Sequence, residues 1–293
     1  MNIIQKCPSC GSERLRPLKG YEECCRLVRC RKCGLTFASE IPDISVTQEI
    51  YDGYGRNDYL SEITVKRYNE LLDTFERYRK TNKILDVGCG IGYFLEVAKK
   101  RGWEVYGTEF SRKAVSICEE KGIVMYDGDV NSAPYTEGQF DIITSFEVLE
   151  HVVNPSDIMS YTERFLRKGG AFYLTTPNFN SLVRISQKSD WDVISKSSHP
   201  EHLVYYTRKS YKYLLKSYGL KSVYIKTTGL SISRLKAKKS GKKEKYISNN
   251  STDEKLRVSI ENSWFKQFAK KVVNFVLSFL GIGDSLKSLS VKI

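Results

Sequence analysis

The spacing of apolar residues along this chain predicts helices that alternate with short buried strands. Between residues 64 and 79, apolar side chains recur at steps of three and four, which is the period of a helix packed along one side. Later apolar runs have the length of buried strands, and helix-like segments lie between them. The predicted strands are 83–87, 104–108, 141–144, 171–175 and 221–227. This alternation is typical of an α/β fold.

The C-terminal part contains a second helical pattern, which is amphipathic. In WFKQFAKKVVNFVLSFLGIG one side of the predicted helix is apolar, while Lys266, Lys270 and Asn274 lie elsewhere. The apolar residues are Phe265, Phe268, Ala269, Val272, Val276, Phe279 and Leu280. Such a helix usually covers the core of its own domain, and we expect that here. A membrane surface, a lipid-linked substrate or a protein partner is the alternative.

Composition places the chain among globular proteins. Its 293 residues are 41% hydrophobic, 12% aromatic and 28% charged, which excludes wholesale disorder and a collagen-like architecture. No apolar run reaches the roughly 18 residues of a membrane span, and the N-terminus lacks the apolar core of a signal peptide. We therefore expect a cytoplasmic protein, which could touch the inner face of the membrane only peripherally, through its C-terminal helix.

Basic residues are concentrated just before that helix. The formal net charge is +13, and residues 233–257 hold nine basic and three acidic residues with almost no apolar ones. This composition favours a solvated, flexible loop over a binding surface. Nucleic acid is the anionic partner that the net charge would favour.

Four of the eight cysteines form two matched pairs. Cys7 and Cys10 belong to CPSCG, Cys30 and Cys33 belong to CRKCG, and 19 residues separate the pairs. Two C-x-x-C turns at this distance are typical of a tetrahedral zinc site with four thiolate ligands. Two disulfides are the alternative, which a reducing cytoplasm disfavours. We therefore predict a structural zinc ribbon whose folding depends on its metal.

The passage KILDVGCGIGYFLEVAKKRGWEVYGTEF carries the strongest chemical signal. A buried strand leads into Gly88, Gly90 and Gly92, which let the backbone approach a ligand while the amides of the next helix point at it. The following strand ends at Glu109, whose carboxylate offers acceptor oxygens to the hydroxyls of a ribose. Strand, glycine turn, helix, strand and acid in this order predict a nucleotide-binding sheet.

Asp86 indicates which ligand this sheet binds. It lies two residues before Gly88, where a carboxylate would repel the pyrophosphate of a dinucleotide. The same charge would stabilise an ammonium or sulfonium cation. The pattern therefore favours S-adenosylmethionine (SAM) over NAD.

Several segments, in order, resemble the successive motifs of class I SAM-dependent methyltransferases. They are ILDVGCGIGYF, VYGTEFS, DGDV, FDIITSFEVLEHV and LRKGGAFYLTTPN, which span about 83–178. CPSCG…LVRCRKCGLTF is similar to the zinc ribbon that precedes many bacterial methyltransferases, including those of polysaccharide and sugar pathways. The resemblance implies a doubly wound, Rossmann-like sheet of seven strands, the last antiparallel, with helices on both faces.

The resemblance also implies roles in SAM binding. Gly88, Gly90 and Gly92 would pass under the methionine part, Asp86 would organise their loop, and Glu109 would bind the ribose. The remaining candidates are Phe110 beside the adenine, Asp129 and Val130 at the adenine edge, and Phe146 near the methionine and the transferred methyl group.

These observations divide the chain into five parts. They are a zinc ribbon (1–40), a linker with an N-terminal helix (41–82), the methyltransferase domain (83–232), the basic loop (233–257), and the amphipathic C-terminal helix with a tail (258–293).

Two of the three histidines lie in SHPEHL, where the resemblance places the substrate side. A hydroxyl acceptor needs a general base or a metal to help remove its proton. We expect His202 to be this base, followed by Glu201 and His199. The alternative is that these residues only fix their loop by hydrogen bonds.

Glu147, Glu150 and His151 are spaced at i, i+3 and i+4, which in a helix puts all three on one face. Together with His202 or Glu201 they would form a second, divalent-metal site beside the acceptor. A helix start stabilised by its carboxylates is the alternative.

The sequence thus predicts a SAM-dependent methyltransferase that acts on a small molecule or a glycan-type acceptor, at oxygen. An RNA methyltransferase that uses the ribbon and the basic loop is one alternative, although SFEVLEH lacks the NPPY-like motif for a nucleobase amine. A non-catalytic, cofactor-binding interaction protein is the other.

Overall fold

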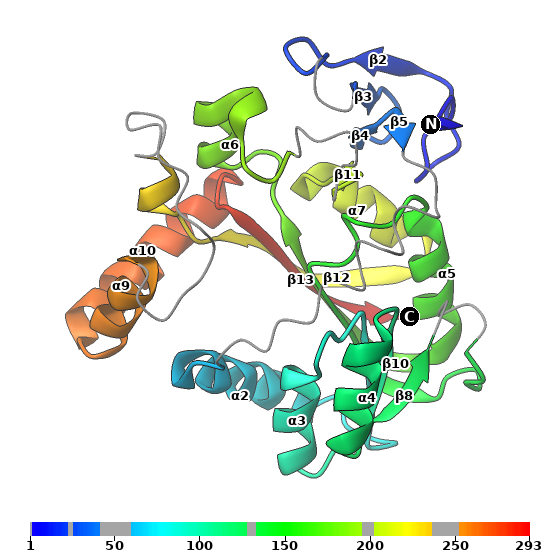
Figure 1. Ribbon diagram of the computed structural model, residues 1–293, viewed down its shortest axis with the longest axis vertical. Helices are drawn as coiled ribbons and strands as arrows, with labels where there is room; N and C mark the ends of the chain where they lie inside the picture. Colours follow the sequence, from blue (N-terminus) through cyan, green and yellow to red (C-terminus); the bar gives the residue numbers. More distant parts are fainter. Residues whose placement is uncertain (1, 23–25, 42–59, 128–132, 195–201, 236–251) are drawn as a thin grey trace.

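A seven-stranded sheet with helices on both faces forms the centre of the molecule (Figure 1). The computed structural model describes residues 2–22, 26–41, 60–127, 133–194, 202–235 and 252–293. The strands of the sheet are β6 (Lys83–Val87), β7 (Glu104–Glu109), β8 (Val124–Asp127), β9 (Phe140–Phe146), β10 (Leu166–Pro177), β12 (Leu220–Thr228) and β13 (Ser285–Lys292). All five strands predicted from the sequence are present.

The strand order is β12-β13-β10-β9-β6-β7-β8, and only β13 runs antiparallel to its neighbours. This confirms the expected doubly wound sheet with one antiparallel strand. The order of connections reverses between β6 and β9, and in such sheets the ligand crevice lies at the carboxyl ends of the strands at this point. The loops after β6, β7 and β9 are therefore the ones that can form a site.

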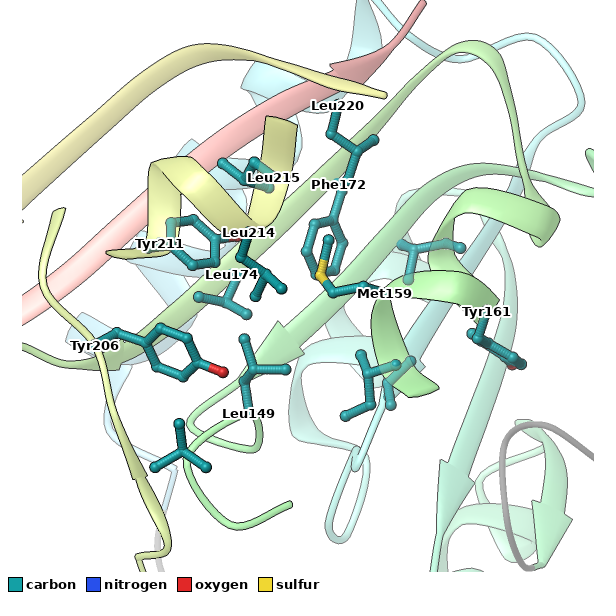
Figure 2. Packing of buried hydrophobic residues seen from close by; sticks show 14 of the residues in the cluster. Leu149, Met159, Tyr161, Phe172, Leu174, Tyr206, Tyr211, Leu214, Leu215 and Leu220 are labelled. Atoms are coloured by element: carbon teal, nitrogen blue, oxygen red, sulfur yellow. The ribbon is translucent and has the colours of Figure 1, made fainter. Parts of the chain in front are cut away.

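Each face of the sheet has its own hydrophobic cluster, because neighbouring side chains of a strand point to opposite faces. Leu85 and Ile143 belong to the cluster under α5 (Pro155–Phe165) and α7 (Arg208–Ser217). Figure 2 shows this cluster, in which Met159 of α5 and Leu214 of α7 lie close to Phe172 and Leu174 of β10. The helices on the other face are α2 (Glu62–Glu76), α3 (Tyr93–Lys100) and α4 (Arg112–Glu120).

The N-terminal ribbon packs on the α5–α7 face and shares its hydrophobic cluster. Leu35 and Phe37 are fully buried there, so the ribbon needs this surface to cover its own apolar residues. Phe37 also pairs with Val204, which joins the two parts through one sheet. The strands of the ribbon region are β1 (Asn2–Ile3), β2 (Leu15–Pro17), β3 (Leu27–Cys30), β4 (Thr36–Ala38), β5 (Glu40–Ile41) and the later β11 (Val204–Tyr205).

The C-terminal residues differ from the expected tail, because Ser285–Lys292 form β13 between β10 and β12. Leu286 and Leu289 are fully buried, on opposite faces of the sheet. Ser288 and Ser290 are fully buried as well. The strand is hard to recognise in the sequence because small polar residues occupy positions that are usually apolar.

The amphipathic helix does not cover the core, so this expectation is wrong. It consists of α9 (Thr252–Glu261) and α10 (Trp264–Leu280), and Leu277 is the one buried residue recorded for α10. Phe265 and Phe279, from the side expected to be inward, have exposed fractions of 65% and 77%. Two further short helical segments are α6 (Leu182–Gln187) and the 3₁₀ turn Lys188–Asp190. No helix in the described part of the chain has the length and apolar character needed to cross a membrane.

Leu289→Ala should destabilise the fold by about 2–5 kcal/mol, because it removes a fully buried side chain from the hydrophobic cluster between the sheet and helices α2 and α3. Ile293→Ala is the matched control, since Ile293 has an exposed fraction of 75% and should change stability by about 0.5 kcal/mol or less. Urea unfolding measures both. Equal stabilities of the two variants would contradict the placement of β13 in the sheet.

Candidate functional site

The glycine loop after β6 is held tightly on one side and is open on the other. The N–H groups of Gly88 and Cys89 donate to the carbonyl of Thr108, at 2.9 and 3.1 Å. Gly88 and Gly90 have φ of 69° and 54°, which disfavours any residue with a side chain. A Cβ at Gly88 would lie 2.6 Å from Val148, whereas one at Gly90 would meet no atom within 4 Å.

Gly92 closes the loop and begins α3, and its tight packing explains why it is glycine. It has a φ of 76°, and an added Cβ would lie 2.6 Å from Ile123 and 2.8 Å from the sulfur of Cys118. Lys121 also donates to the carbonyl of Ile91 at 2.7 Å. The loop is therefore pre-formed, with its open side at Gly90.

Glu109 connects the end of β7 to this loop. Its carboxylate accepts hydrogen bonds from the N–H groups of Gly90, Phe110 and Ser111, at 2.9, 2.8 and 3.2 Å. An ionised carboxylate has about four acceptor positions, so one remains for a ligand hydroxyl. Phe110 is half-exposed beside it, with an exposed fraction of 52%. The structure thus brings both predicted residues to the open side of the loop.

Asp86 lies beneath the loop and is almost completely buried, with an exposed fraction of 3%. Burial raises the pKa of Asp86 to about 7, although the hydroxyl of Thr144, which donates at 2.7 Å, opposes the shift, and the nearby charge of Glu109 adds to it. A cationic ligand would favour the ionised form, which agrees with the expected preference for SAM over a dinucleotide.

Phe146, at the end of β9, lies in a group of aromatic rings. Its ring centroid is 5.0 Å from that of Phe94 and 6.1 Å from that of Tyr68 in α2. Burial raises the pKa of Tyr68 to about 12, and the charge of Asp86 contributes. From the sequence, Tyr68 could be assigned only to the apolar side of a helix. Its spacing does not show that its hydroxyl lies near enough to Asp86 to be affected by the charge of that carboxylate. Asp129 and Val130 lie outside the described residues.

The expected helix at Glu147–His151 is wrong, because these residues form a turn. Glu147 has a φ of 54°, which ends β9 abruptly, and the N–H of His151 donates to the carbonyl of Val148 at 2.9 Å. Glu150 is buried in this turn, whereas Glu147 is exposed, and the two carboxyl groups still lie close enough that the charge of Glu147 helps to raise the pKa of Glu150. Ligand spacing taken from a helix does not apply here.

Glu150, His151 and His202 nevertheless come together, with one ligand atom of each within 4.8 Å of the others. The exposed fraction of Glu150 is 1%, and burial raises its pKa well above the usual value. Thr176 donates to its Oε2 at 2.9 Å, but its Oε1 is buried with no hydrogen-bond partner. A buried carboxylate oxygen without a partner fits a cation held by these three residues.

His202 is oriented by a backbone carbonyl. Its Nδ1 lies 2.7 Å from the oxygen of Val193, so Nδ1 carries the proton and the lone pair is on Nε2. Burial lowers the pKa of His202, which favours the neutral ring. A metal-ligating histidine typically donates its other N–H to a carbonyl in this way. His199 and Glu201 lie outside the described residues.

The glycine loop and this cluster are neighbours. Val148, which limits the space at Gly88, belongs to the same turn as Glu150 and His151. The expected positions of SAM and of an acceptor are therefore on two sides of one short segment.

The four predicted zinc ligands converge in the ribbon. The Sγ atoms of Cys7 and Cys33 are 3.5 Å apart, those of Cys10 and Cys30 are 3.6 Å apart, and all four lie within 4.8 Å of one another. A disulfide would require about 2.05 Å, and sulfurs around tetrahedral zinc lie about 3.8 Å apart when each is about 2.3 Å from the ion. The arrangement fits zinc and does not fit the disulfide alternative.

Comparison with known proteins identifies the family. The family described as "Methyltransferase domain" matches residues 59–225, more than half of the chain. The chain belongs to this family. Its sheet and loops are those of class I SAM-dependent methyltransferases, as the sequence motifs predicted.

The curated relatives match only the central part of this methyltransferase-family chain. The ubiquinone biosynthesis O-methyltransferase of Azoarcus sp. is 35% identical over 106 residues, which are 33% of this chain and 45% of that protein. The enzyme of the same name from Pseudomonas aeruginosa is 31% identical over 105 residues, with the same coverage. The chain thus spans less than half the length of these relatives.

Solved structures support the fold over a longer range. Geranyl diphosphate C-methyltransferase from Streptomyces coelicolor has a TM-score of 0.54 at 14% identity, covering 84% of this chain and 97% of its own. A SAM-dependent methyltransferase from Archaeoglobus fulgidus has a TM-score of 0.50 at 20% identity, covering 85% and 100%. At these identities the likeness shows the fold.

SAM affinity should rise with pH between about 6 and 8 and then level off, because Asp86, with a pKa of about 7, becomes ionised in this range. Asp86→Asn should remove this rise and lower the affinity at pH 8 by about tenfold or more. Calorimetric titration with SAM at three pH values measures both proteins. The amino group of SAM can titrate as well, but it would do so equally with the original protein and with Asp86→Asn. If SAM affinity depended on pH in the same way for both proteins, Asp86 would not be the titrating group.

Cys30→Ser should lose one zinc ion per chain and lower the melting temperature by about 5 °C or more, because the ribbon would no longer support the shared cluster. The matched control is Lys32→Ser in the same knuckle, whose side chain is exposed. Metal content by mass spectrometry and thermal unfolding measure the effect. Unchanged zinc content in Cys30→Ser would exclude this ligand set.

Proposed function

We propose that the chain transfers the methyl group of SAM to a hydroxyl oxygen of a small-molecule acceptor, a class that includes glycan-type molecules. The observation that carries this proposal is the contact of Gly88 with Val148. This contact puts the glycine loop next to the turn that holds Glu150 and His151. The curated relatives, named as O-methyltransferases, support transfer to oxygen.

In this proposal the cofactor residues bind and orient SAM. Gly90 leaves room for the methionine part, and Asp86 compensates its positive charge. Glu109 uses its remaining acceptor position for the ribose, while Phe110 lies against the adenine. SAM already carries an electrophilic methyl group, so the protein has to align an acceptor oxygen and exclude water.

His202 acts as the general base and accepts the proton of the acceptor hydroxyl. Its Nε2 holds a lone pair because Nδ1 donates to Val193, and burial keeps the ring neutral. The ring of His151 lies 4.5 Å away, centroid to centroid, and confines the same space. A proton acceptor beside the cofactor loop suits a hydroxyl better than a nucleobase amine, which is why transfer to oxygen is favoured over transfer to a nucleobase amine.

When a divalent cation is bound, Glu150, His151 and His202 would hold it, and the Nε2 lone pair of His202 would then be a metal ligand instead of the proton acceptor that it is in the metal-free site. Glu147 does not belong to this group of ligands in the described part of the chain. Two imidazoles and one carboxylate suit divalent transition-metal ions such as Zn²⁺, Mn²⁺ or Fe²⁺. Such an ion would lower the pKa of a bound hydroxyl and so supply Lewis-acid assistance. The cysteines Cys7, Cys10, Cys30 and Cys33 would bind a separate, structural zinc ion.

Methyl-labelled SAM incubated with fractions of a cell extract tests the function. We expect label in a small-molecule fraction, and rate losses of about 100-fold or more for Glu150→Gln and His202→Gln, because both change the proton-accepting site without touching the glycine loop. SAM affinity should stay within about threefold of the original protein, and Glu120→Gln, at an exposed position of α4, is the matched control.

Metal content separates the two roles of the cluster. Glu150→Gln should bind one divalent ion fewer than the Glu120→Gln control, as measured by mass spectrometry after dialysis against Mn²⁺. Label that appears only in RNA would contradict the proposed acceptor class. Full activity of both cluster variants would contradict the proposed site.

A further inference from the structure

Helix α10 has one continuous apolar side that faces away from the protein, named here the α10 face. At about 100° per residue, ten apolar residues occupy one half of the helix circumference. They are Trp264, Phe265, Phe268, Ala269, Val272, Val273, Phe275, Val276, Phe279 and Leu280. The nine large ones have exposed fractions of 47–80%. Figure 1 shows α9 and α10 at one side of the molecule, away from the centre of the sheet.

The opposite, more polar side of α10 attaches it to the protein. Asn274 accepts a hydrogen bond from the N–H of Gly229 at 2.9 Å, and Lys270 forms an ion pair with Glu261 at 3.2 Å. Gln267 donates to the backbone of Glu261 at 2.8 Å. This arrangement reverses that of an ordinary surface helix, whose apolar side faces the core.

Specific contacts with the sheet fix the helix in this orientation. Thr227 of β12 donates its hydroxyl to the carbonyl of Leu277 at 2.9 Å, and Arg208 donates to the carbonyl of Ser278. Rotating α10 to bury its apolar side would break these bonds. The exposed apolar side is therefore a property of the folded protein, and an apolar area of this extent marks an interaction surface.

The charges on α10 indicate the occupant of this surface. The helix has three lysines and no acidic residue. Lys266 and Lys271 lie at the two borders of the apolar half, while Lys270 lies on the attached side. An apolar half with Trp and Phe, bordered by lysines, is the pattern of a helix that lies in the interface of an anionic bilayer.

We propose that the α10 face docks the protein on the surface of an anionic membrane. The aromatic and aliphatic side chains enter the boundary between head groups and acyl chains, and Lys266 and Lys271 contact lipid phosphates. A second copy of the chain fits less well, because two such helices would bring like charges together along the borders of the contact. The excess of six positive charges in residues 233–257 adds to the attraction for anionic lipid.

The docked helix would hold the candidate site close to the membrane. Glu261 accepts hydrogen bonds from Lys66 of α2 at 3.0 Å and from Lys270 of α10 at 3.2 Å, so the two helices are connected. Tyr68, two residues after Lys66 in α2, packs against Phe146, with 6.1 Å between the ring centroids. The docking itself does not depend on the proposed function, since it involves none of the site residues.

Vesicle flotation with the full, zinc-loaded chain tests this proposal. The chain should bind vesicles of phosphatidylcholine with 30% phosphatidylglycerol at least about tenfold more strongly than vesicles of phosphatidylcholine alone. Phe275→Glu with Phe279→Glu should lower binding to the anionic vesicles by about tenfold or more, because it puts charge into the apolar half. The matched control is Ile185→Glu, at an exposed apolar position of α6, which should bind like the original chain.

A second pair of variants separates charge from apolar contact. Lys266→Glu with Lys271→Glu should abolish the preference for phosphatidylglycerol. Circular dichroism and SAM binding verify that every variant is folded. Absence of vesicle binding by the original chain, or unchanged binding by the Phe275/Phe279 variant, would overturn the proposal. Concentration-dependent dimerisation that the same variant abolishes would also overturn it, because a second copy would then occupy the α10 face.

Discussion

A strand pairing only two residues long connects the N-terminal cysteine ribbon to the candidate acceptor site. Phe37 of the ribbon pairs with Val204, and on the other side the N–H groups of Leu203 and Val204 donate to the carbonyl of Glu150, at 2.8 and 3.0 Å. His202 precedes this strand and is thereby held against the turn that contains Glu150. If the ribbon unfolded, β11 would lose one partner and leave backbone groups unpaired. The ribbon therefore stabilises the part of the candidate site that contains Glu150 and His202. The sequence, which divides the chain into a ribbon and a separate methyltransferase domain, did not predict this connection.

Two buried carboxylates give the candidate site its electrostatic character. Asp86 and Glu150 have exposed fractions of 3% and 1%, and burial raises the pKa of both. A carboxyl whose folded pKa is raised stabilises the fold least when it is ionised, so Asp86 contributes progressively less as pH rises from about 4 to above 7. Bound cations reverse this effect. The ligand-free fold is thus less stable at neutral pH than its packing allows, and SAM at one carboxylate and a metal ion at the other would each recover stability on binding.

Local sequence signals were sufficient to predict much of this fold, but they did not predict strand β13 or the turn at Glu147. The glycine loop, Glu109 and the cysteine pairs were predictable because each is defined by a few neighbouring residues with a strict conformational or ligand requirement. Strand β13 was missed because Ser288 and Ser290 are buried through contacts with strands far away in the chain. The turn at Glu147 was missed because its φ of 54° interrupts a spacing that also suits a helix. Glu150, His151 and His202 were grouped correctly, but on the basis of a helix that the structure does not contain, because their meeting depends on the pairing of β11 with the ribbon.

The reversed helix shows how far such long-range contacts can override a local pattern. Helices α9 and α10 are inserted between β12 and β13, two strands that pair directly in the sheet. Both ends of the insertion are therefore fixed, and Thr227 and Asn274 determine which side of α10 faces the protein. An amphipathic pattern alone predicts that the apolar side of a helix is covered, but it does not indicate whether the protein core, a partner or a membrane covers it. Because the insertion is anchored at both ends rather than tethered by one flexible linker, a membrane bound to α10 would have a defined orientation relative to the sheet. The carboxyl ends of the strands, where the cofactor loop lies, would then keep a constant position relative to the lipid surface.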